Sequence, residues 1–189
     1  MRPTGAIRPL GSIRAAELTW SPDGSTLAYQ GGENDAQELW LVDADGSNER
    51  LLTNVGSANH GIGPVWSPRG DRIVYQRLCC DRAEGHEVVL VNVADGNETV
   101  IAPPMTDGEN GRESWYPFGV TWSPDGTTLL YSAWSNLSGS AIGGTGLGVV
   151  TVPADAPTDV TVLTKGIGFG GQLYGSRWAP TQTWGRQPG

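Results

Sequence analysis

The chain has 189 residues, of which 38% are hydrophobic and 17% charged, and it contains 28 glycines and 13 prolines. A chain of this length and composition can bury a core, and its many turn-forming residues favour short strands over long helices. Its formal net charge of −8, with only 12 lysines and arginines, argues against a nucleic-acid-binding protein, because phosphate recognition needs clustered basic side chains.

The first 14 residues have two interpretations. The segment 6–10 resembles the later segments 49–53 and 160–164, each of which ends a repeat. Residues 1–14 are therefore either an N-terminal arm or the last strand of a preceding repeat.

The first repeat spans about residues 15–54 and contains the phrase Trp20-Ser21-Pro22-Asp23-Gly24. Serine suits the first position of a type I turn, and proline presets φ at the second. Glycine then supplies the left-handed residue that closes a three-residue hairpin. The phrase predicts a tight turn between strands at 17–20 and 25–30. Two further strands, at 38–43 and 49–53, flank a second turn that contains an Asp-Gly pair.

The same phrase recurs along the chain. Full copies begin at Trp66 and Trp122 and an incomplete copy begins at Trp178, so the four tryptophans are 46, 56 and 56 residues apart. The second and third repeats span about residues 63–103 and 118–165, and a fourth begins within residues 173–189. We interpret ten positions of the phrase as structural: Trp20, Pro22, Gly24, Trp66, Pro68, Gly70, Trp122, Pro124, Gly126 and Trp178.

Each full repeat predicts four antiparallel strands, and repeated four-stranded sheets of this length are typical of β-propeller blades. The sequence thus predicts an all-β protein, a partial β-propeller of about three four-stranded antiparallel blades with stray terminal strands. Closed propellers have four to eight blades. Three blades therefore need either the remainder of a longer chain or self-association to close a ring.

The repeats resemble the TolB-like class of propeller repeats. The resemblance rests on the Trp-Ser-Pro-Asp-Gly turn, the Leu-x-Tyr strand at 27–29 and the stretch 39–53, and it covers about residues 15–180. The class includes periplasmic Tol-system proteins and the gating domains of prolyl-oligopeptidase-like enzymes. It implies a non-enzymatic scaffold for a protein or peptide partner in the periplasm or another extracytoplasmic compartment. The alternative is the gating propeller of a serine hydrolase whose catalytic domain is absent from this sequence.

Strand alternation separates two kinds of connection. The first and third turns of each repeat lie at one end of the sheet, and they are short and similar between copies. The loops at the other end are long and dissimilar, and binding sites commonly lie on such loops. We predict partner contacts there from the residue types that dominate interfaces: Arg112, Trp115, Tyr116, Phe118, Trp134, Phe169 and Tyr174. These aromatic residues could instead pack between blades.

No pattern in the sequence indicates catalysis, a metal or a cofactor. The chain has no Gly-x-Ser-x-Gly nucleophile elbow, and its glycine cluster at 143–148 fits neither a P-loop nor a dinucleotide fingerprint. Its two histidines, His60 and His86, and its two cysteines, Cys79 and Cys80, lack the spacing of a zinc site or a disulfide framework. We therefore predict a module that needs no cofactor.

Two further features concern location and partners. No apolar run approaches the length of a membrane span, and the Met1-Arg2-Pro3 start lacks the apolar core of a signal peptide. The sequence by itself therefore gives no compartment. The acidic charge indicates either a well-solvated surface or a docking face for a basic partner.

Overall fold

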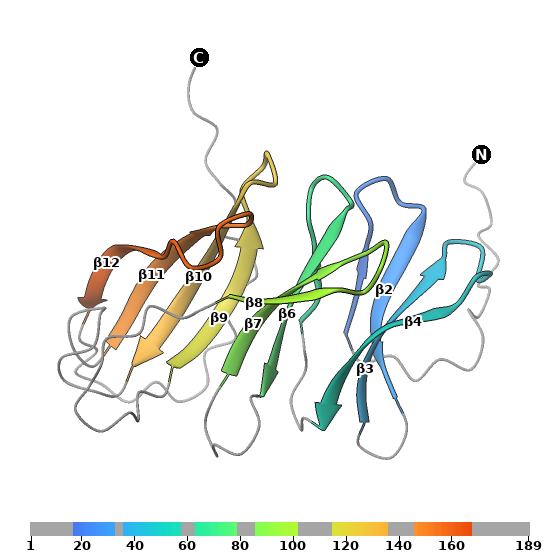
Figure 1. Ribbon diagram of the computed structural model, residues 1–189, viewed down its shortest axis with the longest axis horizontal. Helices are drawn as coiled ribbons and strands as arrows, with labels where there is room; N and C mark the ends of the chain where they lie inside the picture. Colours follow the sequence, from blue (N-terminus) through green and yellow to red (C-terminus); the bar gives the residue numbers. More distant parts are fainter. Residues whose placement is uncertain are drawn as a thin grey trace, which may run out of the picture.

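The computed structural model describes residues 17–32, 36–57, 63–78, 86–101, 115–135 and 146–167. These residues form β-strands and the turns between them (Figure 1). The strands make three four-stranded antiparallel sheets, which confirms the predicted all-β class and partial propeller. Over the described ranges there is no helix that is long and apolar enough to cross a membrane.

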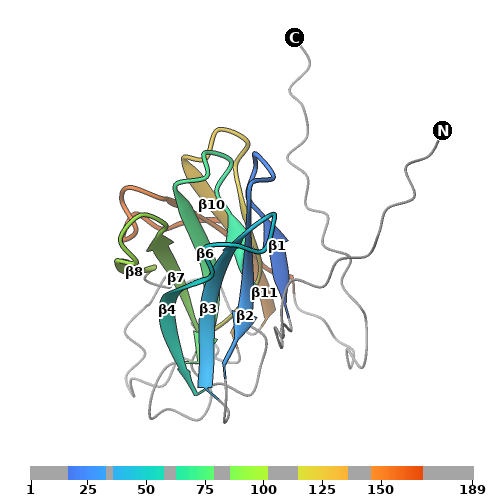
Figure 2. The ribbon, with the colours of Figure 1, turned by 90° about the vertical axis from the view of Figure 1, so that its right-hand side faces the viewer.

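Each sheet keeps its strands in chain order, and we call the sheets blades 1, 2 and 3. Blade 1 contains β1 (Leu18–Trp20), β2 (Thr26–Gly31), β3 (Ala36–Asp43) and β4 (Arg50–Ser57). Blade 2 contains β5 (Val65–Trp66), β6 (Arg72–Leu78), β7 (His86–Asn92) and β8 (Glu98–Ile101). Blade 3 contains β9 (Trp115–Trp122), β10 (Thr128–Ser135), β11 (Gly146–Pro153) and β12 (Thr161–Ile167). Figure 1 shows the blades side by side in this order, and Figure 2 looks onto blade 1 with the others behind it.

Both faces of the middle blade are apolar, because the inner strands carry long runs of Val, Ile and Leu. Alternate residues of a strand point to opposite faces, so such runs are buried only when a neighbouring sheet covers each face. Between blades 1 and 2 the core contains Ala28, Leu39, Leu41, Ile73, Tyr75 and Val89. Between blades 2 and 3 it contains Val74, Val88, Leu90, Leu129, Tyr131 and Val150. Equivalent strand positions form both cores, so each blade packs against the next one in the same way.

The tryptophan of the turn phrase ties each blade to the preceding one. Trp66 Nε1 donates to Thr19 O at 3.3 Å, and Trp122 Nε1 donates to Val65 O at 3.2 Å. Each acceptor is the residue just before the preceding tryptophan. Trp66 and Trp122 are buried, whereas Trp20, on the first blade, is 49% exposed.

The turns of the phrase have the predicted glycine geometry. Gly24, Gly70 and Gly126 have φ values of 71°, 74° and 69°. Each donates its N–H to the serine carbonyl three residues earlier, at 2.9, 3.0 and 2.9 Å, as in a type I turn.

The loop of the hairpin is one residue longer than the predicted three. Trp20 pairs with Leu27, so residues 22–25 form the loop between Ser21 and Thr26. The Thr26 N–H is bound by Ser21 Oγ at 2.9 Å, while the Ser21 N–H donates to Thr26 O at 2.8 Å. The Ser21 carbonyl accepts from the Gly24 N–H, so the serine side chain takes the Thr26 donor in place of that carbonyl.

Two strands extend further than the sequence indicated. The segment from Trp115 to Pro117 and the segment around Trp134 were predicted to lie in loops, but β9 begins at Trp115 and β10 ends at Ser135. Pro117 has no N–H to donate, and it is tolerated in a strand since β9 is the edge strand of its sheet.

Some predictions fall outside the described residues. They are the interpretation of residues 1–14, the fourth first strand within 173–189, and any role of His60, Cys79 or Cys80.

Candidate functional site

The short turns of each blade lie at one end of the sheets. Ala44 N–H donates to Ser25 O at 2.8 Å, which joins the β3–β4 turn to the β1–β2 turn. The equivalent bonds run from Val93 N–H to Asp71 O and from Ala154 N–H to Thr127 O, at 3.0 and 2.8 Å. We call this end the turn face and the opposite end the loop face. The first-to-second-strand hairpins of the turn face lie at the top of Figure 1.

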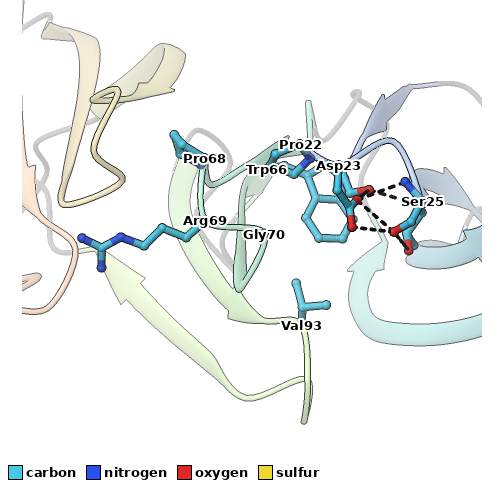
Figure 3. A pocket seen from close by; sticks show the side chains of 10 residues that line it. Pro22, Asp23, Ser25, Trp66, Pro68, Arg69, Gly70 and Val93 are labelled. Carbon is cyan, nitrogen blue, oxygen red and sulfur yellow. Dashed lines mark hydrogen bonds between the residues drawn. The ribbon is translucent and has the colours of Figure 1, made fainter.

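A depression of about 410 Å³ lies on the turn face between blades 1 and 2 (Figure 3). The β1–β2 turn forms one wall and the β5–β6 turn forms the other, and Val93 lines it from the turn after β7. Its surface is mixed, because Trp66, Pro22 and Pro68 are apolar and Asp23 carries a charge. A depression of this composition can bind a side chain that has both an apolar stem and a charged end.

Asp23 is held in one orientation by its own turn. Its Oδ1 accepts from Ser21 Oγ at 2.6 Å and from the Ser25 N–H and Oγ at 3.0 and 2.8 Å. The hydrogen bond from Ser21, followed by those from Ser25, lowers the pKa of Asp23 to about 2. The carboxylate is therefore ionised at neutral pH. It is also exposed at the rim of the depression.

Blade 3 repeats this turn, and blade 2 changes it. Asp125 accepts from Ser123 Oγ at 2.6 Å and from Thr127, and the pKa of Asp125 is likewise lowered to about 2, chiefly by the Ser123 bond. In blade 2 the same position is Arg69, and Ser67 Oγ donates instead to Asp71 Oδ1 at 2.6 Å. The second turn thus keeps its serine bond and gains a cationic side chain.

Arg69 does not point into the depression. Its Nε donates to Asp125 O at 3.0 Å, and Figure 3 shows the guanidinium turned away from Pro22 and Asp23. The charge inside the depression is therefore that of Asp23.

Two checks describe the polar side chains of the described residues. Among the described residues, no group of three or more His, Cys, Asp or Glu side chains is placed to hold a metal ion. Every buried side-chain nitrogen or oxygen in the described part has a hydrogen-bond partner.

Only some of the predicted contact residues lie in the part of the chain that the structure describes. Arg112, Phe169 and Tyr174 lie outside the described residues. Four others lie in strands of blade 3, where the register puts Trp134 opposite Tyr116, Ser135 opposite Trp115 and Ser132 opposite Phe118. The structure therefore brings Trp115, Tyr116 and Trp134 to one end of two paired strands, at the loop face. Their role in binding remains a prediction.

Sequence reasoning missed the depression on the turn face. The turns there are short and alike, and we attributed binding to the variable loops. The signal that could have found it is Arg69, the one basic residue at the fourth position of the full turn phrases.

The chain is similar to two kinds of protein in sequence. It is 38% identical over 132 residues to the uncharacterized peptidase YuxL of Bacillus subtilis, an alignment that covers 67% of this chain and 17% of YuxL. It is 40% identical over 62 residues to the Tol-Pal system protein TolB of Anaeromyxobacter dehalogenans, which covers 32% of this chain and 14% of TolB. The chain thus spans less than a fifth of either relative. No protein-family model matches it.

Solved structures agree on the fold. The putative TolB from Agrobacterium tumefaciens superposes with a TM-score of 0.52 at 24% identity, covering 80% of this chain and 48% of that one. The chain has a partial β-propeller fold like that of this TolB. A prolyl endopeptidase gives a TM-score of 0.56 at 16% identity, with 84% of this propeller and 23% of that chain covered. Relatives of the propeller therefore include peptidases as well as TolB proteins.

Proposed function

We propose that this propeller is a non-enzymatic module that binds a protein or peptide through its loop face, as part of a longer or self-associated ring. The observation that carries the proposal is the register of β9 and β10, which gathers Trp115, Tyr116 and Trp134 at one end of blade 3. Tryptophan and tyrosine supply much of the energy at protein interfaces. The TolB likeness supports an extracytoplasmic location.

Selection from a displayed peptide library on the immobilised chain tests this proposal. A selected peptide should bind Trp134→Ala at least about tenfold more weakly than the wild type, as expected for a hot-spot residue. Trp20→Ala is the matched control, because Trp20 is an exposed tryptophan that lies on blade 1. A library that yields no binder, or a peptide that binds Trp134→Ala and the wild type equally, would contradict the proposal.

A second candidate is the gating propeller of a serine peptidase. The observation that favours it is the alignment with YuxL, which covers 67% of this chain, about twice the share covered by TolB. The coding sequence beyond residue 189 separates the two. Further blades and a stop codon support the binding module, and an α/β-hydrolase pattern with Gly-x-Ser-x-Gly supports the peptidase.

Both candidates share one expectation for the chain as given. It should not turn over generic ester, peptide or phosphate substrates, because its sequence contains no nucleophile–base, metal or nucleotide motif. Activity that survives purification and disappears on mutation of a single loop residue would contradict this.

A further inference from the structure

The chain itself shows how the groove between two turn phrases is filled. Arg69, in the turn of blade 2, crosses to the turn of blade 3, where its Nε donates to Asp125 O at 3.0 Å. Its stem lies over Gly126, since a Cβ built on that glycine would be 3.2 Å from Arg69 Cγ. One arginine side chain therefore occupies the groove between blades 2 and 3.

The equivalent groove between blades 1 and 2 is open. The residue in the position of Arg69 is Asp23, which is too short to cross. A Cβ built on Gly70, the counterpart of Gly126, would have Pro22 Cδ as its nearest neighbour, at 3.8 Å. The counterpart of the acceptor Asp125 O is Arg69 O, and none of the described residues donates a hydrogen bond to it. This open groove is the depression of about 410 Å³.

A second sequence difference between blades 1 and 2 also widens this groove. At the start of β6, Arg72 lies with its guanidinium 5.8 Å from the Trp122 ring centroid and donates to Ala154 O at 3.2 Å. The counterpart in blade 1 is Thr26, which lines the depression. Arg50 replaces part of this function, because its Nη2 donates at 2.7 Å to Val93 O, the counterpart of Ala154 O. Between blades 1 and 2, Arg50 therefore partly takes the place that Arg72 has between blades 2 and 3. None of the described side chains takes the place of Arg69.

The charges around the groove favour a cation. The Asp23 carboxylate stands at the rim, and its Oδ2 accepts only from Ser25 Oγ, at 2.9 Å, among the described groups. Arg69 directs its charge toward blade 3 and Arg50 is engaged by Val93 O. The chain as a whole carries a net charge of −8, which attracts basic partners.

We propose that this depression binds an arginine side chain supplied by a protein or peptide partner, in the position that Arg69 takes one blade further along. The guanidinium donates to Arg69 O and faces the Asp23 carboxylate, and the alkyl stem packs over Gly70. Arginine suits the site better than lysine, because its stem can lie on an apolar surface while a planar group with several donors reaches both acceptors. The site is on the turn face, so it is separate from the aromatic positions of the loop face.

The probe is the peptide acetyl-Gly-Arg-Gly-amide, titrated into the ¹⁵N-labelled chain. We expect saturable shifts of the Thr26, Gly70 and Val93 amide signals. The citrulline peptide, which has the same shape without the charge, should bind at least about tenfold more weakly. No saturable shift at these amides, or equal binding of the arginine and citrulline peptides, would overturn the proposal.

A pair of turn exchanges completes the test. Asp23→Arg with Ser25→Asp gives blade 1 the turn sequence of blade 2, so the chain should fill its own groove and lose peptide binding. Asp125→Arg with Thr127→Asp makes the same exchange in blade 3, away from the depression, and should leave binding within about twofold of the wild type. Binding that persists in the first variant, or is lost equally in both, would overturn the proposal. Both turn exchanges lie on the turn face, so neither should change peptide binding at the loop face. The arginine site and the proposed function can therefore fail independently.

Discussion

Gly24 and Gly96 share a left-handed backbone, with φ values of 71° and 73°, but differ in their surroundings. A Cβ on Gly24 would meet nothing within 4 Å, whereas a Cβ on Gly96 would be 2.6 Å from Leu52 O of blade 1. We expect Gly24→Ala to cost about 1 kcal/mol from backbone strain. Gly96→Ala should cost clearly more, since the clash is with the backbone of another blade. Urea unfolding of the two variants measures the difference.

A third glycine calibrates this comparison. A Cβ on Gly126 would be 3.2 Å from Arg69 Cγ, which belongs to a flexible side chain that can move. Gly126→Ala should therefore lie between the other two, and Gly126→Val should destabilise more than Asp125→Ala, whose side chain only assists the turn. Equal losses for Gly24→Ala and Gly96→Ala would show that the blades move apart at no cost.

The turn aspartates predict a dependence of stability on acid. The pKa of Asp125 is about 2 in the folded chain and about 3.9 in an unfolded one. A lowered folded pKa gives stability that is fully present above the unfolded value and is lost as the pH falls through the folded one. The urea midpoint of the wild type should therefore decrease as the pH is lowered from about 4 to about 2.

The control for this titration is the double variant Asp23→Asn and Asp125→Asn. It removes both lowered pKa values and leaves amide oxygens that can still accept hydrogen bonds. Its urea midpoint should change less with pH over the same interval. Parallel curves for the two proteins would mean that the turn hydrogen bonds do not stabilise the ionised carboxylates.

At the scale of single residues, the sequence predicted conformation better than contacts. The left-handed glycines follow from Ser-Pro-Asp-Gly alone, because the turn type requires positive φ at a fixed position. The extra loop residue does not follow, because it depends on Ser21 Oγ displacing a backbone acceptor. The contact of Arg69 with blade 3 is harder still to predict, since it depends on where that blade places Asp125 O.

At the scale of the elements, the tryptophan ties predict an order of sensitivity. Trp66→Phe and Trp122→Phe each remove a part-buried bond to a carbonyl of the preceding blade. Each should cost about 1 kcal/mol for the bond, plus the loss of packed ring atoms. Trp20→Phe should cost little, because Trp20 is 49% exposed. Unfolding free energies of the three variants give the order.

The order would be wrong if Trp20→Phe destabilised the chain as much as Trp66→Phe. That result would mean that Trp20 is engaged by a neighbour, as Trp66 and Trp122 are.

The strands themselves were predictable where the pattern was local. Alternation and turn signals located the inner strands, and β3 ends at Asp43 as expected. The ends at the loop face were not predictable, because Pro117 reads as a break unless β9 is known to be an edge strand. The pairing of Tyr116 with Trp134 likewise depends on a bulge between Leu130 and Ser132, which no local pattern marks.

At the scale of the whole molecule, the repeat predicted the stacking and missed the difference between interfaces. Three copies of one phrase implied equivalent blades, and the two cores confirm equivalent packing. The grooves above those cores differ, because Asp23 and Thr26 stand where blade 2 has two arginines. A repeat predicts what its copies share, and a site that depends on their differences has to be found in the structure.

The outer blades predict self-association of the isolated chain. Leu18 and Trp20 of β1 are 57% and 49% exposed, and Leu163 of β12 is 56% exposed. Leu52 is the counterpart of Leu163 in blade 1, because each lies at a register shift between the third and fourth strands of its blade. Leu52 is only 7% exposed, since blade 2 covers it. Apolar patches and unpaired sheet faces of this kind drive association. Light scattering should show oligomers, and the urea midpoint should rise with protein concentration.

Charged substitutions locate the surfaces responsible. Trp20→Lys combined with Leu163→Lys should shift the chain toward monomer, because each charge would be buried at a blade-to-blade contact. Val100→Lys is the control, since Val100 is 42% exposed but lies on the middle blade, so it should leave association unchanged. A wild-type chain that is a monodisperse monomer, with a cooperative transition independent of concentration, would contradict the prediction. It would mean that the two cores between three blades stabilise the fold without a closed ring.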